Sequence, residues 1–90
     1  YAWGSFFDNI TNSLYIADFN NQRIVRWPSG ASSGTLVAGT TGVAGNTSLL
    51  LNNPMAVIFD ASGLMYVFDA GNRRVQRFTV GNPTGTTILS

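Results

Sequence analysis

The sequence contains the stretch Leu14-Tyr-Ile-Ala-Asp-Phe-Asn-Asn-Gln-Arg-Ile-Val-Arg-Trp27 and repeats it as Met65-Tyr-Val-Phe-Asp-Ala-Gly-Asn-Arg-Arg-Val-Gln-Arg-Phe78. The polar residues that return 51 positions later are Tyr15, Asp18, Asn21, Arg23 and Arg26, as Tyr66, Asp69, Asn72, Arg74 and Arg77. The apolar positions return in the same register. A repeat of this period is typical of solenoids, propellers and arrays. It predicts a scaffold unit that is built twice, and it says little about a reaction.

Short β-prone runs dominate both copies. Tyr15-Ile-Ala17 and Ile24-Val-Arg-Trp27 flank a turn-rich segment, and so do their equivalents in the second copy, which predicts a β-hairpin in each. Thr35–Ala38 and Thr86–Leu89 are predicted as fourth strands. No stretch of ten or more residues has the period of an amphipathic helix. In the long loop that follows the first copy, Leu49-Leu-Leu51 is expected to pack against the core.

The repeat divides the chain into a first unit at 1–40, a loop at 41–53 and a second unit at 54–90. Upstream, Phe7-Asp8 matches Phe59-Asp60 with a slip of one residue, which an insertion in a surface turn explains. A stable repeat array generally needs three or more units. We therefore expect these two units to pack against copies of the chain or against further units of a longer chain. A longer chain is considered because the sequence starts with Tyr1 and not with Met, which suggests a processed chain or a fragment.

The second copy resembles an NHL repeat. The resemblance rests on a Pro-led strand from Pro54, an Asp60-Ala-Ser-Gly63 turn, a Tyr66-Val-Phe-Asp69 strand, and Asn72-Arg-Arg-Val75 before a strand that ends in an aromatic residue. The first copy is similar from Leu14 onward, but it lacks the Pro and has Asn9–Ser13 in place of the Asp-x-x-Gly turn. The resemblance implies an all-β fold made of β-propeller-type blades of four antiparallel strands. It does not imply one function, since such propellers serve as protein-binding, RNA-binding, enzymatic and extracellular modules.

The composition argues against several classes of function. The chain has neither His nor Cys, which removes the usual general base, the thiol nucleophile, disulfides and most zinc sites. A net charge of +1 is too small for many phosphate contacts. No apolar run approaches the roughly 20 residues of a membrane span. We therefore expect a protein that is not an enzyme, needs no cofactor or metal, and has no nucleic-acid partner and no membrane span.

The recurring polar residues are interpreted as structural. Asp and Asn bond backbone groups in turns, and an Arg two residues after the Asn can pair with the Asp. This reading covers Asp18, Asn21 and Arg23 together with Asp69, Asn72 and Arg74, and it extends to Tyr15 and Tyr66. A catalytic residue would be expected once and not in both copies.

Two sequons, Asn9-Ile-Thr11 and Asn46-Thr-Ser48, lie in predicted loops and predict N-glycosylation at Asn9 and Asn46. Only 10% of the residues are charged, against about 25% in ordinary globular domains, so attached glycans would help solubility. The sequence thus predicts a secreted, extracellular, non-enzymatic scaffold that assembles with copies of itself as a filament or a ring. The alternative is a fragment of a larger closed propeller that binds a protein, a peptide or a carbohydrate.

Overall fold

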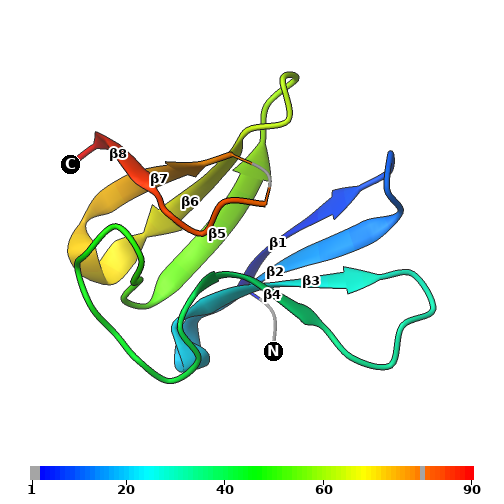
Figure 1. Ribbon diagram of the computed structural model, residues 1–90, viewed down its shortest axis with the longest axis horizontal. Coiled ribbons are helices and arrows are strands. Elements are labelled where there is room, and N and C mark those ends of the chain that lie inside the picture. Colours follow the sequence, from blue (N-terminus) through cyan, green and yellow to red (C-terminus); the bar gives the residue numbers. More distant parts are fainter. Residues whose placement is uncertain (1–2, 80) are drawn as a thin grey trace.

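Two four-stranded antiparallel sheets make up the protein (Figure 1). The computed structural model describes residues 3–79 and 81–90. The first sheet consists of β1 (Trp3–Asp8), β2 (Ser13–Asp18), β3 (Arg23–Pro28) and β4 (Thr35–Gly39). The second consists of β5 (Pro54–Phe59), β6 (Met65–Asp69), β7 (Arg74–Phe78) and β8 (Thr86–Leu89). Single 3-10 turns, η1 (Phe19–Asn21) and η2 (Ala70–Asn72), join the middle strands.

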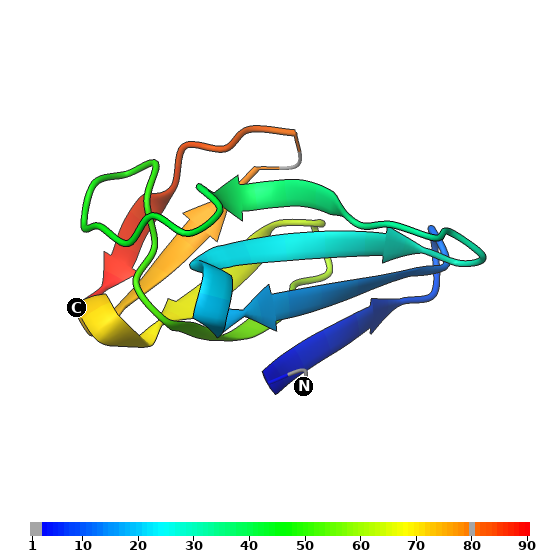
Figure 2. The same ribbon diagram turned by 90° about the horizontal axis from the view of Figure 1, so that it is seen from below.

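Each sheet is a meander in which neighbouring strands follow one another along the chain. Figure 2 shows this order for the first sheet, from β1 to β4. The expected all-β fold and its four antiparallel strands per unit are confirmed, including both predicted fourth strands. This architecture is compatible with two propeller blades.

The two sheets turn opposite sides toward their common core. We call face A the side that carries Tyr15 and Ala17 in the first sheet, and Tyr66 and Phe68 in the second. Face B is the other side. Tyr15 and Ala17 are buried against the second sheet, whereas Phe68 is exposed. The core is therefore face A of the first sheet packed on face B of the second. Among the described residues, face B of the second sheet contributes four buried apolar side chains: Val57, Met65, Val67 and Phe78.

The contact between the sheets is made chiefly by β1 and β2 against β5. The ring of Phe59 lies 4.6 Å from the ring of Tyr15 and 5.3 Å from that of Phe6, measured between centroids. Gly4 lies where the backbones meet. A Cβ atom built on Gly4 would sit 2.2 Å from the Met55 carbonyl oxygen and 2.5 Å from the Ala56 Cα. Only glycine permits this approach.

The repeat in sequence is also a repeat in backbone conformation. Asp18 has φ −93° and ψ 79°, and its equivalent Asp69 has φ −90° and ψ 79°. Each 3-10 turn ends in a left-handed residue, Gln22 with φ 60° and Arg73 with φ 53°. The recurring residues thus build the same turn twice, although the side chains around the two turns differ.

The loop between β4 and β5 is held by two isolated bridges, Thr40 with Val43 and Ala44 with Leu51. Leu51 is buried in the core, but Leu49 is half-exposed, so the expectation that Leu49 packs inward is wrong. The physical reason is local. Residues 47–50 form a turn in which Leu50 N–H donates to the Thr47 carbonyl, and that turn points Leu49 outward while the following bridge directs Leu51 inward.

Candidate functional site

A buried polar cluster fastens the inter-sheet loop to the second sheet. Asp69 is fully buried and accepts three hydrogen bonds: from Asn52 N at 2.7 Å, Asn72 Nδ2 at 2.8 Å and Arg74 Nε at 2.7 Å. The last of these is also an ion pair. The expected Asp–Arg pairing is therefore present here, and it is combined with a backbone contact from the loop.

Arg74 and Asn72 also bind loop carbonyls. Arg74 donates through Nη1 to the Asn46 carbonyl at 3.1 Å, and through Nη2 to those of Thr47 and Leu50, each at 2.8 Å. Asn72 Nδ2 donates to the Gly45 carbonyl at 2.7 Å. These bonds satisfy carbonyls that have no strand partner, so the cluster acts as a clamp on the loop.

The equivalent cluster on the first sheet holds far less. Asp18 accepts from Asn21 Nδ2 at 3.1 Å and from Arg23 Nε at 2.9 Å. Among the described residues, the only further partner of the Arg23 side chain is the Thr41 hydroxyl, at 3.2 Å. The side chains of Arg23 and Asp18 are 31% and 26% exposed, against 10% and 0% for Arg74 and Asp69. The same residues therefore form an open ion pair in one sheet and a buried clamp in the other.

Both sequons lie on exposed loops. Asn9 is in the turn between β1 and β2 and Asn46 is in the loop after β4, and both residues are exposed. Beside Asn9, the Asp8 carboxylate accepts from the Thr11 hydroxyl at 2.7 Å and from the Ile10 N–H at 3.0 Å. These bonds, with that of Thr11 the stronger cause, lower the pKa of Asp8.

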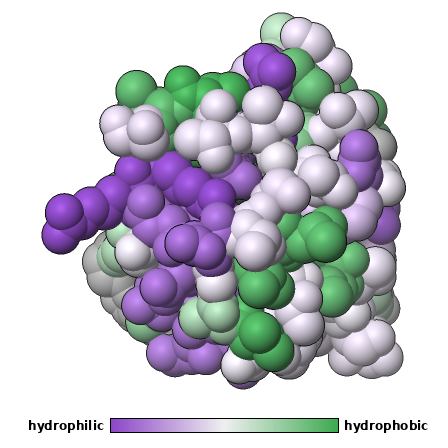
Figure 3. Space-filling model, turned by 60° about the vertical axis from the view of Figure 1, so that its left-hand side comes forward, coloured by the Kyte–Doolittle hydropathy of each residue, from purple (hydrophilic) through white to green (hydrophobic). Residues whose placement is uncertain are grey.

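The outward sides of the two sheets carry exposed apolar residues. Face A of the second sheet exposes Ile58, Phe68 and Leu89. Face B of the first sheet exposes Phe7 and Leu36. In Figure 3, hydrophobic side chains form several separate groups on the visible side of the molecule, with hydrophilic and neutral ones between them. Each outward face thus offers exposed apolar side chains for contact with another sheet.

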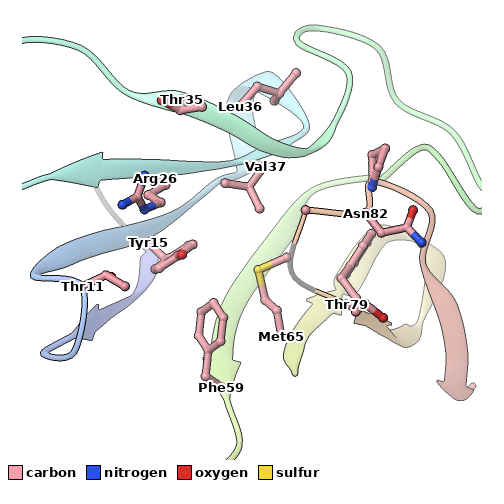
Figure 4. Close-up of a pocket in the computed structure, with 13 residues that line it drawn as sticks. Thr11, Tyr15, Arg26, Thr35, Leu36, Val37, Phe59, Met65, Thr79 and Asn82 are labelled. Carbon is pink, nitrogen blue, oxygen red and sulfur yellow. The ribbon is translucent and has the colours of Figure 1, made fainter. Parts of the chain in front are cut away.

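A cleft of about 470 Å³ opens between the two sheets, with β2, β3 and β4 on one side and β5, β6 and β7 on the other (Figure 4). Its first-sheet wall includes Tyr15, Arg26 and Val37, and its second-sheet wall includes Phe59 and Met65. Among the lining residues that the structure describes, Arg26 has the one charged side chain. Sequence reasoning missed this site, because Tyr15 and Arg26 recur in both copies and the repeat gave them a structural reading. The one feature of the sequence that pointed to a difference between the two copies was the one-residue insertion after Asp8. The spacing of the residues did not predict how this insertion changes the side-chain contacts.

Within residues 3–79 and 81–90, no group of three or more His, Cys, Asp or Glu side chains is placed to hold a metal ion. No helix in this part of the chain is long and apolar enough to cross a membrane. Comparison with protein-family models gives no match for the chain, and comparison with curated protein sequences gives no significant match. What the chain does must therefore be inferred from its own geometry.

Proposed function

We propose that the chain is a non-enzymatic, extracellular structural module whose NHL-like blades assemble with copies of the chain, in a head-to-tail contact that continues the packing between its own two sheets. Glycans at Asn9 and Asn46 keep this weakly charged assembly soluble. Head-to-tail contacts of this kind either close a ring or continue as a filament.

One observation carries the proposal: each outward face repeats the residue positions of a face that the chain itself buries. Face A is buried on the first sheet and exposed on the second. Face B is buried on the second sheet and partly exposed on the first. A second copy can therefore lay face A of its second sheet on face B of this chain's first sheet, with the geometry of the internal contact.

Aromatic contacts within the chain indicate which residues would meet between copies. Phe7 occupies the position of Phe59, and Ile58 that of Phe6, each 52 residues apart. The internal contact between Phe6 and Phe59 would recur as Ile58 of one copy against Phe7 of another. Both side chains are exposed, at 58% for Ile58 and 54% for Phe7, and each buried large apolar side chain contributes about 1.5–3 kcal/mol.

The alternative is that further blades of a longer chain cover the same faces and close a propeller that binds a protein, a peptide or a carbohydrate. This reading is favoured by the packing of the inner strands β1 and β2 on β5, with an open cleft toward the outer strands, because blades arranged around an axis also diverge outward. In a longer propeller, neighbouring blades would make the same contact between face A and face B. The two hypotheses therefore differ only in whether the next sheet belongs to another copy or to the same, longer chain.

Replacing Ile58 with lysine is expected to abolish self-association and leave the melting temperature within a few degrees of that of the unmodified chain. Burying the lysine charge of face A against an apolar neighbouring sheet is costly, so the contact between copies is lost. In the folded monomer the lysine side chain stays in water, so the stability of the monomer changes little. Sedimentation velocity at increasing protein concentration measures the change. Ile10→Lys is the matched control, because Ile10 is 91% exposed on the turn after β1 and lies outside face A. Equal association of the two variants, or a chain that is monomeric at every concentration tested, would refute assembly through face A.

Material from the native source is expected to carry N-linked glycans at Asn9 and Asn46, because both side chains are exposed on loops. Release with an N-glycosidase in heavy-oxygen water should convert both residues to labelled Asp, which peptide mass spectrometry detects. Asn82 provides an internal control, since the Pro that follows it excludes the sequon. Unmodified Asn at both positions would remove glycosylation from the proposal and leave the sheet contact untouched.

A further inference from the structure

We propose that the cleft between the two sheets binds an organic carboxylate with an apolar body, and that Tyr15 and Arg26 hold the carboxylate group. The two residues lie directly opposite each other on β2 and β3. Directly opposed side chains on one face of an antiparallel pair start about 5 Å apart, close enough to reach one small group together. This site lies inside the chain and does not depend on assembly through the outward faces.

The second sheet shows what the tyrosine of such a Tyr–Arg pair binds. Tyr66 and Arg77 are the equivalents of Tyr15 and Arg26, and they oppose each other in the same register. The Tyr66 hydroxyl donates to Oδ2 of Asp60 at 2.9 Å. This bond raises the pKa of Tyr66, and the nearby Arg77 opposes that rise. In this sheet, the tyrosine of the pair is therefore supplied with a carboxylate by the chain itself, although no ion pair joins Arg77 to Asp60.

In the first sheet the corresponding carboxylate has no hydrogen bond to the tyrosine. Asp8 is the equivalent of Asp60, and in both residues Oδ1 accepts N–H groups of the turn. In the turn with the one-residue insertion, however, Oδ2 of Asp8 accepts from the Thr11 hydroxyl, whereas Oδ2 of Asp60 accepts from Tyr66. The field of Arg26 contributes to lowering the pKa of Asp8, yet no ion pair joins the two. In the described part of the chain, neither the Tyr15 hydroxyl nor the Arg26 guanidinium has a side-chain hydrogen bond to a protein atom. In the first sheet, the Tyr15 hydroxyl and the Arg26 guanidinium can therefore donate hydrogen bonds, but no carboxylate of the described residues accepts them.

The remaining residues of the cleft indicate the size and polarity of the part of the ligand that lies beyond its carboxylate. Apolar side chains line it on both walls, namely Val37 from β4 and Phe59, Met65 and Phe78 from the second sheet. Figure 4 places Tyr15 and Arg26 on one wall, with Met65 and Thr79 across from them. The ring of Phe59 packs against that of Tyr15 and fixes its position. A volume of about 470 Å³ lies within the range of small-molecule sites, about 300–1,000 Å³. The other described lining residues are uncharged, with threonines and Asn82 beside the apolar side chains. A single Arg in such a cleft suits one carboxylate on an aryl or short alkyl group.

4-Phenylbutyrate and its uncharged primary amide are suitable probes, with the two methionine methyl groups of the chain as reporters in NMR. Met65 lines the cleft and Met55 does not. We expect phenylbutyrate to shift the Met65 methyl signal saturably and to leave that of Met55 in place. The amide should bind at least about tenfold more weakly, because it lacks the charge that Arg26 binds.

Matched substitutions in the two sheets isolate the site. Arg26→Gln should weaken phenylbutyrate binding about tenfold or more, and Tyr15→Phe, which keeps the packing, about threefold or more. Arg77→Gln removes the same charge at the equivalent position outside the cleft and should leave binding unchanged. Melting temperatures show that each variant is folded. Equal binding of acid and amide, equal losses for Arg26→Gln and Arg77→Gln, or an unmoved Met65 methyl at millimolar phenylbutyrate would each overturn the proposal.

Discussion

Replacing Arg74 with alanine is expected to lower the free energy of unfolding by about 3–5 kcal/mol, because it leaves the carboxylate of Asp69 buried without its ionic partner. The same substitution at Arg23 is expected to cost about 1 kcal/mol or less, as is usual for an exposed ion pair. The two residues are repeat equivalents, but Arg74 bonds Asp69 and three loop carbonyls, whereas Arg23 bonds Asp18 and one hydroxyl.

Urea denaturation of both variants, side by side, measures this difference. Arg74→Lys is a useful companion, since it keeps the charge but loses the planar fork that reaches several carbonyls at once, and it should recover only part of the loss. Equal destabilisation by Arg23→Ala and Arg74→Ala would show that the loop clamp contributes nothing beyond the ion pair. A loss of partner binding with unchanged stability would show that these arginines have a binding role in place of a structural one.

Replacing Gly4 with alanine is expected to destabilise the chain by about 2–5 kcal/mol. A Cβ atom there would lie 2.2 Å from the Met55 carbonyl oxygen, so the backbones of β1 and β5 must move apart. Overpacking of this kind costs about 1–3 kcal/mol. The left-handed conformation of Gly4, with φ 56°, adds about 1–2 kcal/mol for a residue with a side chain.

Gly63→Ala is the matched control for Gly4→Ala. Gly63 also has a positive φ of 86°, but no atom lies within 4 Å of a Cβ built there. Thermal unfolding should therefore show only the conformational cost of about 1–2 kcal/mol at Gly63. If the two variants lose the same stability, the close approach of β1 and β5 does not hold the sheets together.

The strands, the hairpins and both Asp–Arg pairs could be predicted from the sequence, because each depends on residues that are close in the chain. Alternation predicted β3 and β7, and the recurring Asp, Asn and Arg predicted the same turn in both units. The backbone angles at Asp18 and Asp69 agree within a few degrees. Short-range patterns of this kind are preserved by the repeat.

The differences between the two units could not be predicted, because the repeat makes equivalent residues look alike. Tyr15 is buried and Phe68 is exposed on the same face, since the first sheet has a neighbour on that side and the second has none in the structure. The unequal environments of Arg23 and Arg74 have a similar origin, because Arg74 binds three backbone carbonyls of the loop between the sheets, whereas Arg23 binds a single hydroxyl of that loop. The exposure of Leu49 depends on one turn in that loop. Three successive leucines did not indicate which of them would face the core and which would face solvent.

Disulfide cross-linking of two single-cysteine variants tests the head-to-tail contact most directly, because the chain has no Cys of its own. Phe7→Cys places a thiol on face B of the first sheet, and Ile58→Cys places one on face A of the second. When the two variants are mixed and oxidised, head-to-tail packing predicts a mixed dimer between Cys at 7 and Cys at 58, with little dimer from either variant alone. Dimers that form equally well from one variant alone, or no mixed dimer above the level of unfolded chains, would contradict the assembly of the chain through these two faces.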